Sequence, residues 1–65
     1  MYFYINIQTG EVYKETCEYA NPAKYPSIKF LGIFNYPSEA IRYAKNQGFY
    51  NADGCAYCCP TAHTR

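Results

Sequence analysis

The fold of this chain depends on a segment near its C-terminus that runs Cys55-Ala56-Tyr57-Cys58-Cys59-Pro60-Thr61-Ala62-His63. Three of the four cysteines lie in this segment, and the fourth is Cys17. The chain has only 65 residues, and a domain of about that size buries only about 60% of the surface that it exposes when unfolded. We therefore expect a metal ion, disulfides or a partner to stabilise the fold.

The spacing of the cysteines predicts a metal site. A Cys-x-x-Cys pair on a tight turn brings two sulfurs to one ion, so Cys55 and Cys58 would form one half of the site. Cys17 would supply a third ligand from the other half of the chain. For the fourth ligand we expect His63, because adjacent side chains usually point apart and Cys59 would rarely share an ion with Cys58. Such ligands predict structural zinc, which contributes ~10–16 kcal/mol of apparent binding free energy.

Disulfides are the alternative way to stabilise the chain, although each contributes only ~2–5 kcal/mol. Four cysteines allow three pairings. A bridge between Cys58 and Cys59 would be strained, so Cys17 would pair into the C-terminal segment and His63 would be an ordinary surface residue. No signal peptide and no apolar run of ~20 residues is apparent. We therefore expect a cytoplasmic protein without a membrane span, and reduced thiols in that compartment favour metal binding.

Hydrophobic patterning at the start of the chain predicts a β-hairpin. Phe3, Ile5 and Ile7 alternate with polar neighbours, which is typical of a half-buried strand. The pair Thr9-Gly10 predicts a two-residue loop into a second strand at residues 11–14. A third strand is expected at residues 28–34, with a bulge near Gly32. One face of that strand would carry Ile28, Phe30 and Phe34.

A helix is expected at residues 37–47. Pro37 suits the first helical position, and Gly48 suits the position after the last turn. The apolar stripe of this helix comprises Ala40, Ile41 and Ala44. Residues 49–51 would form a short fourth strand or an extended lead into a turn at Asp53-Gly54.

Together these elements predict a small α+β domain that spans residues 1–65. A β-hairpin and a third strand would pack on one helix, and a Cys-rich C-terminal knuckle would hold zinc. We expect no enzymatic activity, because no nucleophile stands in the context of a catalytic base.

The aromatic residues predict a binding surface. Tyr2 and Tyr4 share the strand face opposite Phe3, and an open aromatic face is typical of a partner site. The net charge is only +1, whereas nucleic-acid-binding domains are usually strongly basic. We therefore expect an interaction module for a protein partner, with nucleic acid as the alternative, and no small-molecule substrate is evident.

Five short stretches follow a known order: Val12-Tyr13-Lys14-Glu15-Thr16-Cys17, Leu31-Gly32-Ile33-Phe34, Ser38-Glu39-Ala40, Gly48-Phe49-Tyr50 and Cys55-Ala56-Tyr57-Cys58. This order resembles the zinc domain of the DNA-methylation-repair protein Ada and short zinc modules found beside some bacterial nucleases. The resemblance implies a zinc-binding fold and a nucleic-acid-binding alternative, but not methyl transfer. One departure is Tyr13, which stands where the family has an upstream ligand, so His63 or Cys59 would complete the site.

Overall fold

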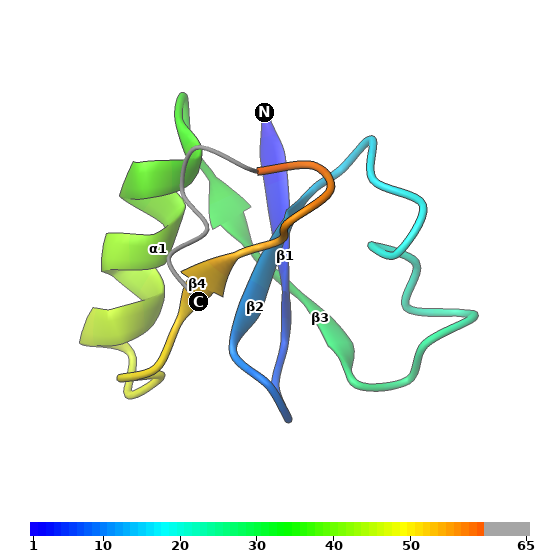
Figure 1. Cartoon of the computed structure of the whole chain (residues 1–65), viewed down its shortest axis with the longest axis horizontal. Helices are drawn as coiled ribbons and strands as arrows, with labels where there is room; N and C mark the ends of the chain where they lie inside the picture. Colours follow the sequence, from blue (N-terminus) through cyan, green and yellow to red (C-terminus); the bar gives the residue numbers. More distant parts are fainter. Residues whose placement is uncertain (60–65) are drawn as a thin grey trace.

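The N-terminal hairpin forms the centre of the sheet. In a computed structural model, which describes residues 1–59, β1 (Tyr2–Asn6) pairs antiparallel with β2 (Glu11–Lys14) and, on its other side, with β3 (Ile28–Ile33). The short strand β4 (Asp53–Gly54) adds to β2 in parallel, so the strand order is β3-β1-β2-β4. One helix, α1 (Pro37–Asn46), completes the fold (Figure 1). The predicted α+β class, hairpin, third strand and helix are confirmed.

Helix α1 begins and ends as its sequence predicts. Proline lies at the start of the helix, and the carboxylate of Glu39 accepts the backbone N–H of Tyr36 at 3.1 Å. At the other end Gly48 has φ +106, and the backbone N–H of Phe49 donates to the Ala44 carbonyl at 3.1 Å. This left-handed glycine ends the helix at little steric cost. Within residues 1–59, no helix has the length and apolarity needed to cross a membrane.

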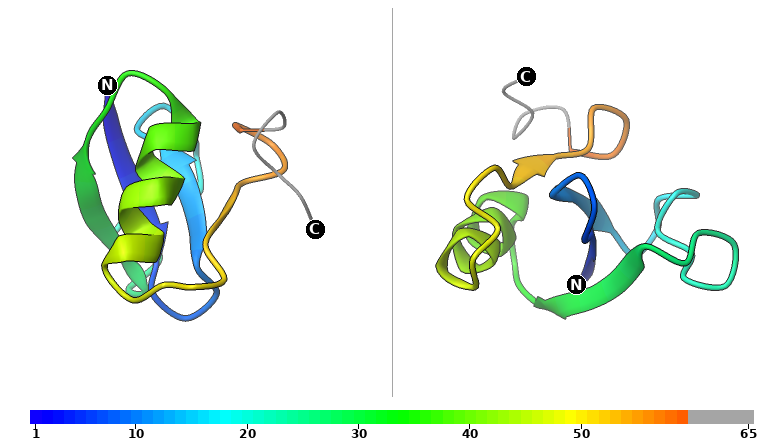
Figure 2. Two further views of the ribbon diagram at one scale, coloured as in Figure 1. Left: turned by 90° about the vertical axis from the view of Figure 1, so that its left-hand side faces the viewer. Right: turned by 90° about the horizontal axis from the view of Figure 1, so that it is seen from below.

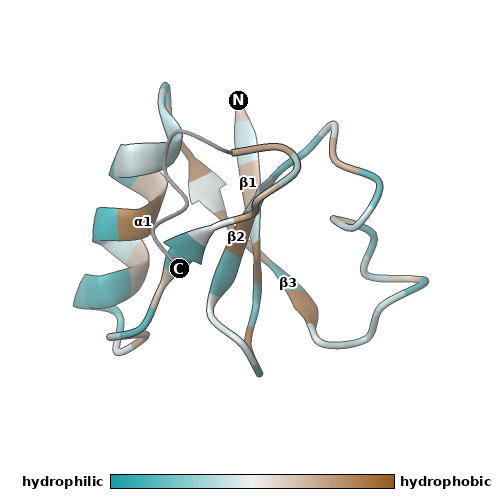
Figure 3. Ribbon diagram, viewed as in Figure 1, coloured by the Kyte–Doolittle hydropathy of each residue, from teal (hydrophilic) through white to brown (hydrophobic). Residues whose placement is uncertain are grey.

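The two faces of the sheet are covered differently. Helix α1 lies on one face, and the long loop of residues 15–27 lies on the opposite side (Figure 2). The helix-side core comprises Phe3, Ile5, Val12, Ala40, Ala44 and Ala52. The loop-side core comprises Tyr13, Ala20, Ile28 and Cys55. Figure 3 shows the apolar positions in brown along β1, β3 and α1. The second core places the loop where it can reach the C-terminal segment.

The hairpin turn is longer than predicted. The side-chain oxygen of Asn6 accepts the backbone N–H groups of Gln8 at 2.9 Å and Thr9 at 3.3 Å, which starts the turn early. The N–H of Gly10 then donates to the Asn6 carbonyl at 2.7 Å. The prediction of a two-residue loop was therefore wrong, and Ile7 is exposed instead of belonging to the strand.

A bulge in β3 changes which residues share a face. Phe3 pairs with Gly32 but Tyr4 pairs with Phe30, so one extra residue lies between them. The predicted bulge is confirmed, but its effect on the alternation was missed. Ile28 is buried in the loop-side core, whereas Phe34 packs on the helix side with its ring centroid 6.1 Å from that of Phe3. Three residues predicted to share one face therefore do not, because the extra residue reverses the alternation.

The pair Asp53-Gly54 is a strand and not the expected turn. Both residues are buried beside β2, and the backbone N–H of Cys55 continues the ladder by donating to the Val12 carbonyl at 2.9 Å. Residues 49–51 are not a strand and lead into β4. This short parallel pairing sets the position of the cysteine-rich segment against β2.

Candidate metal centre

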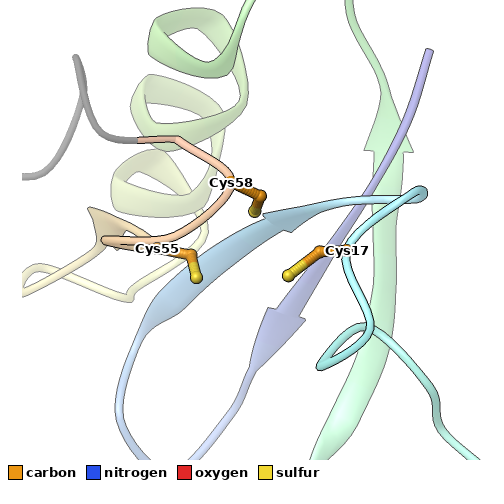
Figure 4. A group of neighbouring side chains, drawn as sticks. All are labelled: Cys17, Cys55 and Cys58. Carbon is orange, nitrogen blue, oxygen red and sulfur yellow. The ribbon is translucent and has the colours of Figure 1, made fainter.

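Three cysteine side chains from distant parts of the chain converge at one point. Cys17 lies in the loop after β2, and Cys55 and Cys58 lie in the segment after β4. Their sulfur atoms all lie within 4.8 Å of one another. Figure 4 shows the three sulfurs pointing toward a common space between the loop and the C-terminal segment. These residues form a group that can hold a metal ion.

The end of β2 organises both halves of this group. The backbone carbonyl of Lys14 accepts the N–H of Cys17 at 3.0 Å, which folds the chain back after the strand. The N–H of Lys14 points to the other half and donates to the Cys58 sulfur at 3.4 Å. A turn holds the C-terminal segment in place, because the N–H of Cys59 donates to the Cys55 carbonyl at 2.8 Å. One residue of β2, Lys14, therefore contacts both cysteine-bearing segments, one through its N–H and the other through its carbonyl.

The sulfur positions suit a soft metal ion with little rearrangement. Zn–S bonds of about 2.3 Å in a tetrahedral site place sulfurs about 3.8 Å apart. The sulfurs of Cys17, Cys55 and Cys58 are within 4.8 Å, so each pair needs to close by no more than about 1 Å. Thiolate ligands select Zn²⁺, Cu⁺ or iron–sulfur clusters over Mg²⁺ or Ca²⁺.

Without a metal, burial keeps the thiols of Cys17 and Cys58 protonated. Burial raises the pKa of the Cys17 thiol to about 12, although a hydrogen bond from the Tyr19 backbone acts in the opposite direction. Burial likewise raises the pKa of Cys58 to about 11, against the effect of the Lys14 backbone N–H. These backbone N–H groups stabilise negative sulfur, which is the form that binds a metal. A bound cation would therefore displace protons from the site.

The sequence predicts His63 as the fourth ligand, with Cys59 as the alternative. His63 lies outside the described residues. Cys59 is buried, and its sulfur lies 3.6 Å from the Cys58 sulfur. The expectation that these adjacent side chains point apart was therefore wrong. Cys59 nevertheless does not belong to the group of three sulfurs that all lie within 4.8 Å of one another. All four cysteines are free thiols in the structure.

The predicted aromatic face is only partly open. Tyr2 is 48% exposed, whereas Tyr4 is half-buried against the loop-side core. Phe30, which is 54% exposed, contacts both rings edge-on, at centroid distances of 5.6 Å from Tyr2 and 5.7 Å from Tyr4. Ile33, paired with Tyr2 across the strands, is also exposed. We call Tyr2, Tyr4, Phe30 and Ile33 the β1–β3 patch. The β3 members of this patch were not predicted from sequence, because the bulge decides which residues of β3 face outward.

Comparison of the chain with protein-family models, curated proteins and solved structures found no match. The resemblance to Ada-like and nuclease-associated zinc modules therefore stays a prediction from short sequence motifs.

Proposed function

We propose that this chain is a small zinc-binding module without enzymatic activity, which acts by binding a protein partner. The convergence of the Cys17, Cys55 and Cys58 sulfurs within 4.8 Å carries the proposal. The ligands come from segments nearly forty residues apart, so one ion would link the loop after β2 to the C-terminal segment. A structural zinc ion would stabilise a fold whose helix-side core includes three alanines.

The fourth ligand in this proposal is His63, with Cys59 as the alternative. The spacing of His63 from Cys58 supports the first choice. The 3.6 Å distance between the sulfurs of Cys58 and Cys59 supports the second, because it is close to the spacing in a tetrahedral thiolate site. Either residue would close the site with four protein ligands. A closed site has no open position for water, which supports a structural role over a catalytic one.

Cobalt substitution tests the metal site directly. Co²⁺ in a tetrahedral thiolate site gives intense visible absorption bands, and their energies report the number of sulfur ligands. For the wild-type protein and for Cys59→Ser, we expect absorption bands typical of three sulfur ligands. For His63→Ala, we expect the bands to change or disappear. If Cys59→Ser alone changes the spectrum, Cys59 is the fourth ligand. The absence of tetrahedral bands in the reduced wild-type protein would contradict the proposal.

The β1–β3 patch is the surface proposed for the partner. It brings Tyr2 and Phe30, both about half exposed, into edge-on contact with each other. Aromatic residues of this kind are enriched in protein interfaces. The strand that carries Phe30 is also an edge of the sheet, so its outer backbone groups are open to pairing with another chain.

A pull-down with matched variants tests this surface. With each protein used as bait, we expect the wild type and Tyr50→Ser to capture a partner protein that the Tyr2→Ser/Phe30→Ser double variant does not capture. Tyr50 is a suitable control because it is 86% exposed and lies outside the patch. Retention on DNA or RNA that falls steeply with salt would instead support a nucleic-acid-binding module. Equal capture by all three proteins would contradict the patch.

A further inference from the structure

A small cavity beside the cysteine group has no role in the proposal above. Its volume is about 250 Å³, and its lining comprises Glu11, Tyr13, Tyr19, Cys55 and Tyr57. These residues come from three segments: β2, the loop of residues 15–27, and the turn after β4. Pockets for drug-sized ligands usually have volumes of about 300–1,000 Å³. This cavity therefore suits a compact chemical group and not a large ligand.

Aromatic rings dominate the lining. Tyr13 and Cys55 are buried and form the inner part, whereas Tyr57 is 79% exposed and lies at the rim. The rings of Tyr19 and Tyr57 are in contact, with centroids 5.5 Å apart and planes inclined by 37°. Glu11 and Tyr13 lie two positions apart on β2, so their side chains share one face of the strand. Three tyrosines and one carboxylate thus surround the same space.

The charge of the lining favours a cation. Glu11 is the one acidic residue, and among residues 1–59 no lysine, arginine or histidine lines the cavity. The faces of aromatic rings are themselves negative. A phosphate or a nucleotide would be repelled here, and a neutral ligand would gain no charge–charge attraction from Glu11.

We propose that this cavity binds a methylated ammonium group. Such a group is compact, carries a permanent positive charge spread over its methyl groups, and is recognised by aromatic rings through cation–π attraction. The rings of Tyr13, Tyr19 and Tyr57 would contact the methyl groups, and Glu11 would balance the charge. The same group occurs on free quaternary amines and on methylated lysine side chains of proteins. The cavity is separate from the β1–β3 patch, so neither site depends on the other.

Titration of the full chain with a matched pair of ligands tests the charge requirement. Choline carries a trimethylammonium group, and 3,3-dimethylbutan-1-ol is its neutral isostere. In NMR titrations of metal-loaded protein, we expect choline to shift signals of Tyr19 and Tyr57 and to bind at least about tenfold more tightly than the alcohol. Equal binding of the two ligands, or no saturable shift with choline at millimolar concentration, would overturn the proposal.

Variants of single lining residues test which of them bind choline. Tyr57→Leu and Glu11→Gln are each expected to weaken choline binding about fivefold or more. Tyr50→Leu is the control, because Tyr50 is as exposed as Tyr57 but does not line the cavity. If Tyr50→Leu and Tyr57→Leu lose choline affinity to the same extent, Tyr57 is not part of the binding site and the assignment is contradicted.

The affinity for a peptide that carries trimethyllysine between glycine and serine residues shows which source of the ammonium group the cavity prefers. Tighter binding of this peptide than of choline indicates a methylated protein as the ligand, and weaker binding indicates a free quaternary amine. Failure of the metal site would appear in the cobalt spectrum, independently of these titrations. A protein that binds the metal but not choline would refute this inference alone.

Discussion

Replacing Cys17 with serine tests whether a metal ion links the two halves of the chain. Cys17 is the member of the sulfur group that lies in the loop of residues 15–27, and the other members follow β4. Removal of this ligand leaves the rest of the site in the C-terminal segment. Serine is nearly the same size, so the change in packing is small. The effect on stability should therefore depend on the presence of metal.

The size of the effect follows from the number of ligands. If zinc binding contributes ~10–16 kcal/mol through four ligands, each ligand accounts for about 2.5–4 kcal/mol. The zinc affinity of Cys17→Ser should therefore fall by about two to three powers of ten. At about 0.05–0.15 kcal/mol per residue, a chain of 65 residues has a stability of about 3–10 kcal/mol. The loss of one ligand is therefore a large fraction of the stability of the chain and equals the lower end of that range.

Urea denaturation, followed by circular dichroism in zinc-buffered solution and again with a chelator, measures this effect. We expect the variant to be less stable than the wild type by about 2.5–4 kcal/mol with zinc and by less than about 1 kcal/mol with the chelator. Thr16→Ser, in the same loop, should match the wild type in both conditions. A loss of equal size with and without zinc would show that Cys17 acts by packing, and would refute the reasoning.

Three further outcomes are expected. Phe3→Ala removes a fully buried ring from the helix-side core and should cost about 3–5 kcal/mol, measured by urea denaturation of metal-loaded protein; a loss below about 1 kcal/mol would contradict that core. Gly48→Ala should cost about 1 kcal/mol in thermal denaturation, because φ is +106 there although the space around a new Cβ is open; an unchanged melting temperature would contradict the conformation. Burial raises the pKa of Cys17 to about 12 and that of Cys58 to about 11, so both thiols must lose a proton on binding metal. These two ligands alone should make the apparent zinc affinity rise about a hundredfold per pH unit near neutrality; a pH-independent affinity in chelator competition would argue against them.

The elements that could be predicted from sequence are those specified locally. Helix α1 is marked by a proline at its first position and by Gly48 after its last turn, and both signals act within a few residues. The hairpin could be predicted in outline because Phe3 and Ile5 alternate with outward residues. The features that were missed depend on contacts between strands. Asp53-Gly54 forms a strand only because β2 lies beside it, and propensity alone favours a turn for this pair.

The candidate site could be predicted in part for the same reason. The Cys-x-x-Cys spacing is local, and Cys17 was the one cysteine outside the C-terminal segment that could join the pair. The 3.6 Å distance between the sulfurs of Cys58 and Cys59 depends on the turn that follows β4, which no sequence rule specified. The tyrosine cavity was missed entirely, because its rings come from three segments that the sheet and the loop bring together.

The most direct test of the account is native mass spectrometry of protein purified without added metal. The protein is measured before and after treatment with a chelator, and its free thiols are counted after denaturation. The account predicts one bound zinc ion, its loss with the chelator, and four free thiols among the four cysteines. A metal-free protein with two or four fewer thiols would instead mean that disulfides stabilise the fold, and would contradict the metal centre formed by Cys17, Cys55 and Cys58.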